Sequence, residues 1–522
     1  MDKLPYALIS LILSCLLEDD GRNRKPWSKP PPIAQYASIS RSWQDAVEMH
    51  TFSQVKVRSD EFSRFETAFR HPYRRQVVST INYDIVLPAY SQARCWKFER
   101  PHEHAENIIV FSQAVHAIIG SLHAWQVEDE AVNGAAGSDC RPIHLNMSAE
   151  SRLDSSSLQR QGIGLYRMGG HFIDFTEPYS VLPEVRRVSE LSIRGVLRPL
   201  HPSAAFRIVS ALPSLEYICI DLLQPDATRE DVQTQHRSAL TQHLSSMNRT
   251  SFSSLRTLYL NWDSCEPWNH SFIPNDLRDP KKGSKDTLSA ALHTISQSLP
   301  ITELFLYGPF IISSELFWPI DSPAPDSPPH WPTLQCLTVN ASIVAPDGTY
   351  YYTGTPGTPG TPEPEDGDPW WPESPRAEAE VDAAGYASDD SRVRDPFNRH
   401  DIRRSNGTLP LNNWRSELDP ERFNPLALAL SRAVCCMPVL GELDFCMGMS
   451  DIQGSSGIVL YGEAESDVAS LLSGNREMEH VKRRGWRAEI GRNAKWEPPE
   501  EMLELWRRFV GPGGVVTVDE RG

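Results

Sequence analysis

The apolar positions of this chain recur in a short pattern, apolar-x-x-apolar-x-apolar, whose end alternates as in a strand with one buried face. Several copies follow an amphipathic helical stripe and a proline. Leu288, Leu292 and Ile295 lie on one helical face, Pro300 ends the helix, and the strand-like segment Ile301–Leu306 begins at once. The copies are Val78/Ile81/Tyr83, Cys140/Ile143/Leu145, Val188/Leu191/Ile193, Leu215/Ile218/Ile220, Leu255/Leu258/Leu260, Ile301/Leu304/Leu306, Leu334/Leu337/Val339 and Leu440/Leu443/Phe445.

The same order of helix and strand returns along the chain. Further helical stripes occur at Ala205/Val209/Leu212, Leu426/Leu430/Val434/Met437, Ile108/Phe111/Val115/Ile118/Leu122 and Leu240/Leu244/Met247. An alternating strand cannot bury its apolar face alone, so stacked helix–strand units with the helices outside are the natural arrangement. The predicted fold class is therefore α/β.

This alternation resembles an irregular leucine-rich-repeat solenoid. The spacing between successive copies is longer and less even than in the usual repeat. The Asn or Cys that normally follows the strand is not in its usual place, although Asn261 and Asn340 approach it. An α/β fold with a parallel sheet explains the same alternation and stays an alternative.

The first 48 residues carry a second pattern. Leu4, Leu8, Leu11, Ile12 and Cys15 have the spacing that lines up one face of a helix, so a short amphipathic helix is predicted. A polar break follows, and a second helix is predicted to start near the segment 39–43. Leu4-Pro5, the Leu/Ile-rich helix and Ile39-Ser40-Arg41-Ser42-Trp43 are the three parts of this pattern.

These three parts together resemble an F-box, the helical module that docks on the adaptor of cullin-type ubiquitin ligases. The insertion Gly21–Pro32 separates the two helices more widely than in the usual pattern. The resemblance implies that the residues forming or supporting the adaptor-binding surface are Leu4, Pro5, Leu8, Ile9, Ile12, Leu13, Ile39 and Trp43.

Two other interpretations of the N-terminal helix are a plain core helix and a secretory signal. A signal is disfavoured by its flanks, because the start lacks a clear basic region and Glu18-Asp19-Asp20 stands where small residues should precede cleavage. The apolar run is too short to span a bilayer, and no other stretch reaches about 18 apolar residues. We therefore expect no membrane-spanning segment.

Four regions are predicted along the chain. Residues 1–55 form the F-box-like module, and 56–345 the repeat body. Residues 346–424 form an acidic insertion rich in Pro and Gly, which is expected to be disordered because it has too little apolar surface to offset its ordering entropy. Residues 425–522 hold the last repeat and a cap, a helix with Met502, Leu505, Trp506 and Phe509 on one face.

Charge and cysteine usage narrow the class of partner. The net charge of −17 argues against nucleic acid or an anionic membrane as the main partner, because both require a basic surface. Eleven acids between Pro356 and Asp395 account for much of it. The nine cysteines lack paired spacing, which favours a reducing compartment and an intracellular location, cytoplasmic or nuclear.

No catalytic constellation is evident in the sequence. His102-Glu103-His104 lacks the spacing of a zinc-protease helix and is interpreted as a polar helix entry. Cys435-Cys436 lies on an apolar helical stripe, where cysteine acts as a small hydrophobe. No catalytic, cofactor-binding or metal-binding residue is predicted, and the chain is not expected to be an enzyme.

The function that follows is substrate recognition in a cullin-type ubiquitin ligase. The adaptor, and through it the cullin, would bind the N-terminal helices, and an unknown protein target would bind the repeat body. The main alternative is a non-catalytic repeat scaffold for protein–protein interaction without a ligase role. An enzyme of unrecognised fold is a more distant alternative.

Overall fold

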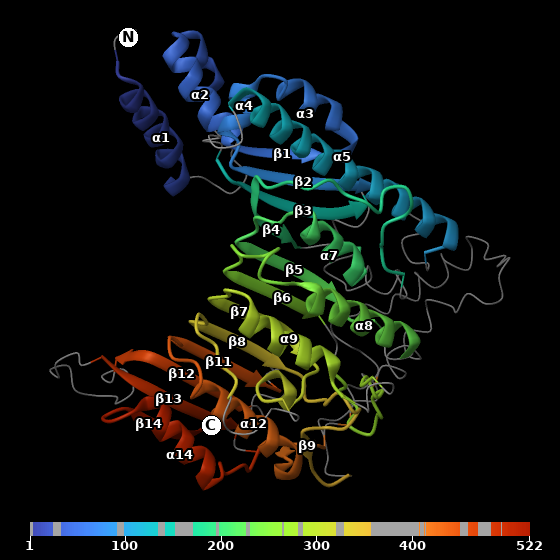
Figure 1. Cartoon of the computed structure of the whole chain (residues 1–522), viewed down its shortest axis with the longest axis vertical. Helices are drawn as coiled ribbons and strands as arrows, with labels where there is room; N and C mark the ends of the chain where they lie inside the picture. The colour runs from blue at the N-terminus through green and yellow to red at the C-terminus, as the bar shows by residue number, and fades with distance from the viewer. Residues whose placement is uncertain are drawn as a thin grey trace.

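The computed structural model describes most of the chain. The described residues are 4–23, 33–90, 99–133, 141–151, 171–194, 198–225, 230–263, 266–279, 285–319, 328–356, 407, 412, 414–448, 458–467, 482–491 and 493–521. They form a mixed α/β structure built on one twelve-stranded sheet, and the two ends of the chain lie toward opposite ends of its long axis (Figure 1).

The strands of this sheet lie side by side in the order of the sequence. All neighbouring pairs are parallel except those of β12, which runs antiparallel to both of its neighbours. The strands are β1 (Gln54–Arg58), β2 (Thr80–Leu87), β3 (Ile143–Ser151), β4 (Val188–Ile193), β5 (Tyr217–Leu223), β6 (Thr257–Asp263), β7 (Glu303–Phe310), β8 (Cys336–Ala341), β11 (Glu442–Met447), β12 (Ile458–Asp467), β13 (Lys482–Gly491) and β14 (Val515–Arg521).

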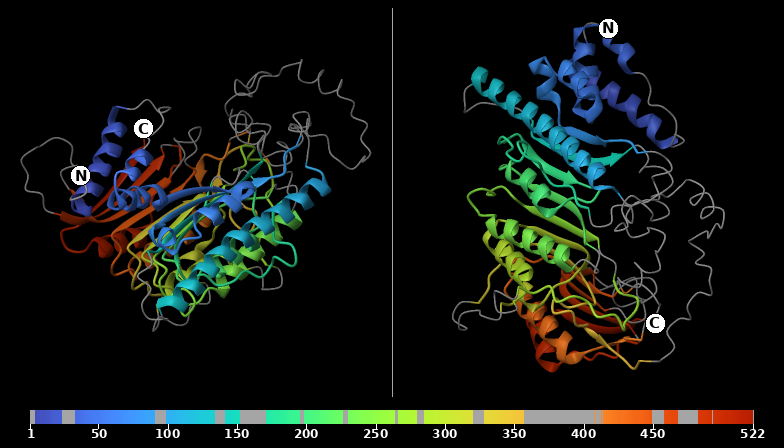
Figure 2. Two further views of the ribbon diagram at one scale, coloured as in Figure 1. Left: turned by 90° about the horizontal axis from the view of Figure 1, so that it is seen from above. Right: turned by 90° about the vertical axis from the view of Figure 1, so that its right-hand side faces the viewer.

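The longer helices of the body lie along one face of the sheet (Figure 2). They are α5 (Pro101–Asn133), α7 (Pro202–Ser210), α8 (Glu230–Ser246), α9 (Thr287–Ser298), α12 (Pro420–Val434) and α14 (Glu500–Val510). The remaining helical segments are α1 (Tyr6–Asn23), η1 (Ile33–Ser38), α2 (Arg41–Ser53), η2 (Ser59–Glu61), α3 (Phe62–Ala68), α4 (Pro72–Val77) and η6 (Ser314–Leu316).

Each of the eight apolar patterns ends in a strand of the sheet, as the alternation predicts. Their middle residues form one continuous row across neighbouring strands, for example Ile218, Leu258 and Leu304. One copy is displaced by two residues. In β3 it is Leu145, the last residue of its copy, that pairs with Leu191. The alternation therefore identifies the strands and, in this one case, misplaces the register.

Burial alternates along the strands because one face packs on helices and the other does not. In β2, Ile81 and Tyr83 are buried, whereas Asn82 and Asp84 are half-buried on the opposite face. The polar residues of that face bond across strands. Asn146 Nδ2 donates to Asn82 Oδ1 at 2.9 Å, and the Ser148 hydroxyl donates to Asp84 Oδ1 at 3.0 Å. We call this helix-free side of the sheet the open face.

Helix α5 is long and apolar enough to cross a membrane, judged by length and composition alone. The sequence predicts no segment of this kind when only unbroken apolar runs are considered. The stripe Val115, Ile118 and Leu122 of α5 is buried in the cluster that contains the sheet. The hydroxyl of Tyr83, on β2, donates to the Ala114 carbonyl at 2.9 Å. A long core helix has these properties.

The predicted insertion, 346–424, lies mostly outside the described residues, so its expected disorder stays a prediction. Both of its ends belong to the body. Tyr350, Tyr351 and Tyr352 are buried, and a short antiparallel pair joins β9 (Tyr352–Thr353) to β10 (Glu417–Leu418). The body therefore extends beyond both predicted boundaries, because three aromatic side chains anchor the first end and α12 begins within the other.

The predicted C-terminal helix is present as α14. Trp506 is fully buried and stacks on Trp486 of β13 with 5.2 Å between ring centroids. Its indole Nε1 donates to the hydroxyl of Ser431 on α12 at 2.8 Å. Helix α14 thus covers the C-terminal end of the sheet on the face that carries the other long helices. Strand β14 follows it as the last strand of the sheet.

Candidate functional site

The predicted docking residues lie in a small N-terminal unit made of α1, η1 and α2, which we call the N-terminal module. Pro5 stands just before α1, and its carbonyl accepts hydrogen bonds from the amides of Leu8 and Ile9 at 2.9 and 3.2 Å. Proline suits this position because the first amides of a helix have no intrahelical acceptor. At the start of α2, the carbonyl of Ser40 accepts from the Gln44 amide at 2.9 Å.

The inner side of the module is a separate hydrophobic cluster. Ile9, Leu13 and Trp43 are at most 4% exposed, and they pack with Ala46 and Val47 of α2. The rings of Tyr36 and Trp43 lie 6.0 Å apart. Three of the eight predicted site residues, Ile9, Leu13 and Trp43, therefore support the module from within and do not offer a surface to a partner.

The outer side of α1 is an apolar ridge. Its aliphatic side chains are 36–58% exposed, and half of the fourteen exposed large apolar side chains among the described residues belong to this module. Soluble proteins seldom gather such residues in one place, so this concentration sets the outer side of α1 apart from the other described surfaces. The ridge comprises Leu4, Leu8, Leu11, Ile12 and Leu16, and Ile39 is exposed in the same module.

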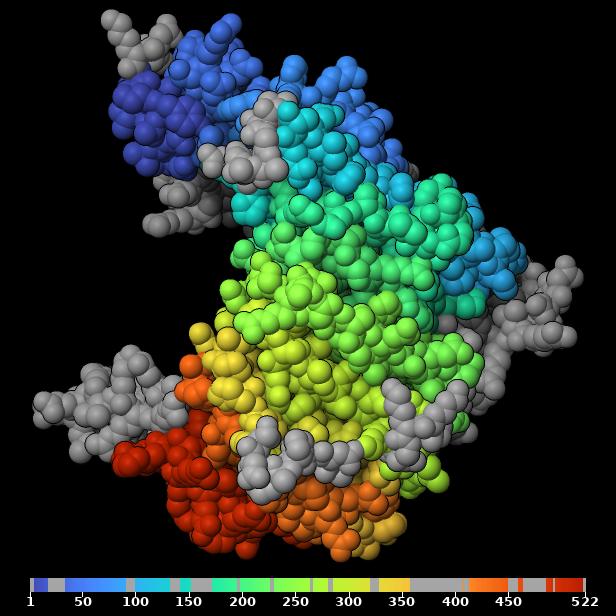
Figure 3. Space-filling model, viewed as in Figure 1, coloured from blue at the N-terminus to red at the C-terminus, as the bar shows by residue number. Residues whose placement is uncertain are grey.

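The module is fixed to the body at one end of the molecule (Figure 3). The guanidinium of Arg74, on α4, donates to both carboxylate oxygens of Glu48, on α2, at 2.9 and 3.2 Å. This hydrogen bonding lowers the pKa of Glu48. The hydroxyl of Tyr73 donates to the Asp45 carbonyl at 3.2 Å. In addition, α2 ends at Ser53 and β1 begins at the next residue.

A second candidate surface lies on the open face of the sheet at β5, β6 and β7. Four half-buried aromatic side chains, Tyr217, Tyr259, Phe305 and Tyr307, form an aromatic patch there. Tyr259 stacks on Tyr307 with 4.9 Å between centroids, and Phe305 lies 6.0 Å from both rings. These residues occupy the open face because their neighbours on each strand, such as Leu258 and Leu306, point into the core.

Arg194 joins this patch from the end of β4. Its Cζ lies 4.7 Å from the centroid of Tyr259, and its Nη2 donates to the Tyr217 hydroxyl at 3.1 Å. Its Nε donates to Cys219 Sγ at 2.6 Å. Burial raises the pKa of Tyr217 to about 12, so its hydroxyl stays protonated at neutral pH. The patch thus offers ring faces, a guanidinium and a phenol.

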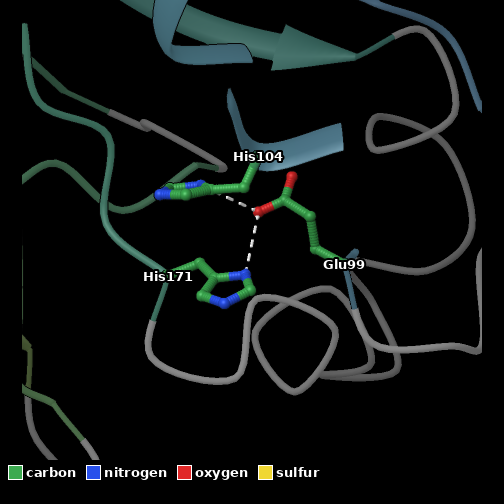
Figure 4. Close-up of side chains that lie close together, drawn as sticks. All are labelled: Glu99, His104 and His171. Atoms are coloured by element: carbon green, nitrogen blue, oxygen red, sulfur yellow. Dashed lines mark hydrogen bonds and ion pairs between the residues drawn. The ribbon is translucent and has the colours of Figure 1, made fainter. Parts of the chain in front are cut away.

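A third group of side chains comes together where α5 begins. Glu99, which is buried, lies between His104 and His171 (Figure 4). Its Oε2 is 3.2 Å from His104 Nδ1 and 3.5 Å from His171 Nδ1, and the two imidazoles stack with 4.6 Å between centroids. Arg198 Nη1 donates to the other carboxylate oxygen at 2.7 Å. Hydrogen bonds to the two imidazoles and the charge of Arg198 outweigh desolvation and lower the pKa of Glu99.

The histidines and cysteines that stand out in the sequence as possible catalytic or metal-binding groups differ in burial and in their partners. His102 is exposed, whereas His104 belongs to the cluster with Glu99, so the two histidines of His102-Glu103-His104 do not act together. Burial raises the pKa of both Cys435 and Cys436, which disfavours the reactive thiolate. Cys435 Sγ lies 3.5 Å from the Leu505 carbonyl as a hydrogen-bond donor.

No protein-family model matches the chain, and no curated protein is similar to it in sequence.

Proposed function

We propose that this chain is the substrate-recognition subunit of a cullin-type ubiquitin ligase, binding the adaptor through its N-terminal module and a protein target through the open face of its sheet. The observation that carries the proposal is the apolar ridge of α1. Leu8 is 46% exposed although the next residue, Ile9, is 1% exposed. A helix with one apolar side in its own small core and another apolar side outside it suits docking between partner helices.

The choice of an adaptor as partner comes from the resemblance to the F-box. Leu4-Pro5, the ridge and Trp43 correspond to its parts in order. The fixed junction of α2 and β1 supports this role, because a receptor must hold its target in a defined place relative to the ligase. The chain would hold the target near the ligase and would not itself catalyse ubiquitin transfer.

The target surface is proposed to be the aromatic patch. Tyrosine and arginine are enriched among the residues that dominate protein–protein binding energy, and here they meet on a helix-free face. Two carboxylates stand on the same strands as these rings, Asp221 on β5 and Glu303 on β7. Glu303 accepts from the Thr257 hydroxyl at 2.9 Å, and Asp221 accepts from Asn261 Nδ2 at 3.3 Å. A peptide with both apolar and basic groups fits this surface best.

The test is adaptor capture by the full chain. Leu8→Ala together with Ile12→Ala should weaken adaptor binding by about 2 kcal/mol or more, roughly thirtyfold, because buried anchors at an interface carry such energies. The matched control is Ile109→Ala, on α5, whose side chain is 45% exposed against 46% for Leu8. This control should bind like wild type. Binding is measured by titration of purified adaptor, with circular dichroism to verify folding.

Equal binding by the ridge variant and the control, or no binding by folded wild type, would exclude the proposed adaptor role. Tyr259→Ala with Tyr307→Ala provides the second arm, since it should preserve adaptor binding and lose the target. A chain that binds a target through the patch and no adaptor would be a scaffold without a ligase role. The patch and the N-terminal module lie apart along the sheet, so each can be changed without touching the other, and the two roles can be tested separately.

A further inference from the structure

We propose that Glu99, His104 and His171 form a binding site for one divalent transition-metal ion of the zinc class. This site is independent of the proposed ligase role, because it lies where α5 begins, in the body and outside the N-terminal module and the aromatic patch. Two imidazole nitrogens and one carboxylate oxygen lie within 4.8 Å of one another. The set of two histidines and one glutamate is a recognised three-ligand set for zinc.

The distances between the ligand atoms fit a tetrahedral ion. Ligands that lie about 2.0–2.1 Å from zinc in a tetrahedron are about 3.3 Å from one another. Glu99 Oε2 lies 3.2 Å from His104 Nδ1 and 3.5 Å from His171 Nδ1. The imidazole nitrogens lie within 4.8 Å of each other, so the two stacked rings must turn toward a shared ion to bind it.

The groups behind the ligands also fit a metal site. A ligating carboxylate is normally held by hydrogen bonds to its second oxygen. Here Arg198 Nη1 and the Asn107 amide both donate to Glu99 Oε1, which leaves Oε2 directed at the two histidines (Figure 4). The side chains of Glu99 and Arg198 are 2% and 1% exposed. Such burial fixes the carboxylate in place.

The carboxylate end of the site is buried, and its two histidines are partly exposed. The His104 and His171 side chains are 20% and 32% exposed, so both imidazoles reach the surface, although the Nδ1 atom of His171 is itself buried. Three protein ligands leave one tetrahedral position for water or for another donor. Imidazole nitrogen favours zinc, copper or nickel over magnesium and calcium, which prefer oxygen ligands.

The ion would tie together parts of the chain that are far apart in sequence. His104 is on the first turns of α5, whereas His171 lies in the segment that leads to the isolated bridge between Ile173 and Leu200. A metal that binds only the native state stabilises it by mass action. The competing interpretation is that Glu99 simply accepts hydrogen bonds from two imidazoles without any ion.

The experiment uses the full chain after removal of metal with a chelator. Wild type should take up about one equivalent of Zn²⁺ by isothermal titration and melt at a higher temperature when loaded. Co²⁺ should give the intense visible absorption of a tetrahedral site. His104→Ala and His171→Ala should each weaken Zn²⁺ binding at least about tenfold and abolish that absorption. Both substitutions leave the buried Glu99–Arg198 pair intact.

The matched control is His102→Ala, an exposed histidine two positions away at the start of the same helix, which should bind Zn²⁺ like wild type. Near-ultraviolet circular dichroism of the metal-free proteins establishes that each variant is folded. Absence of stoichiometric binding in folded wild type overturns the proposal in favour of the metal-free hydrogen-bonded cluster. Equal binding by wild type and the two ligand variants overturns it as well, because the ion would then lie elsewhere.

Discussion

The N-terminal module and the sheet body place their apolar residues in opposite ways. In the body, the apolar stripes of helices and strands meet in one extended cluster, and the open face of the sheet is largely polar. In the module, five buried residues form the whole of the second cluster, and a ridge of larger aliphatic side chains remains outside. The body therefore buries most of its large apolar side chains within itself, whereas the module leaves many of its own exposed. The outer residues of α1 do little for the fold, which is what a docking surface requires.

The largest effect is expected in the body, at Trp506. Trp506→Ala removes a fully buried ring that stacks on Trp486 and donates to Ser431, so it should lower the free energy of unfolding by about 3–5 kcal/mol. Glu504→Ala, on the exposed side of the same helix, should change it by less than about 0.5 kcal/mol. Urea unfolding of both variants measures the difference, and similar curves would show that α14 is not part of the core.

A somewhat smaller and local effect is expected in the module, at Leu13. Leu13→Ala should cost about 2–4 kcal/mol, because its side chain is fully buried in the small cluster. The loss should increase amide exchange within residues 6–53 and leave the main thermal transition of the body in place. Leu16→Ala, on the exposed side of α1, is the control. If the main transition moved with Leu13→Ala, the two clusters would unfold as one unit.

The third prediction concerns pH and the body alone. Burial is the main cause that lowers the pKa of His236 to about 3, and its Nδ1 has no hydrogen-bond partner among the described residues. Because the folded pKa lies below the unfolded value of about 6.5, the stability is fully present above pH 6.5 and is lost as the pH falls toward 3. Between pH 7 and pH 5 the neutral imidazole should account for a loss of about 2 kcal/mol.

His236→Leu provides the control for this pH effect. It removes the titrating group and keeps an apolar side chain against Phe172, whose ring centroid is 3.9 Å from that of His236. The variant should lose less stability than wild type between pH 7 and pH 5, as measured by urea unfolding at each pH. Identical losses would mean that the imidazole is hydrated or paired in solution.

The sequence predicts the strands of the parallel part of the sheet well, because each unit repeats the same local pattern of apolar residues. A stripe such as Leu288, Leu292 and Ile295, followed by a strand with alternating burial, is recognisable without any distant partner. Strands β1, β12, β13 and β14 are not anticipated. Segments such as Lys482–Gly491 carry many charges, and they become strands through pairing with neighbours that no short pattern specifies. The resemblances to leucine-rich repeats and to the F-box stay predictions.

The candidate sites show a similar limit. Helical periodicity assigns Leu8 and Leu13 to α1, but it cannot say which of them meets Trp43, because that contact depends on how α2 returns across the helix. The cluster of Glu99, His104 and His171 has no sequence signature, since its members are brought together by the tertiary fold. His102 and His104, separated by one residue, stand out in the sequence, yet only His104 lies beside Glu99 and His171.

Because α2 passes directly into β1, each strand of the sheet lies at a fixed distance from the N-terminal module. No connecting residue separates the helix from the strand, and the strands follow one another in sequence order. Neighbouring strands lie about 4.8 Å apart, so β5 to β7 stand roughly 20–30 Å along the sheet from the helical end. A target held on those strands would be presented at one reach and one angle. Moving its contacts to another strand would change that reach in steps of about 4.8 Å.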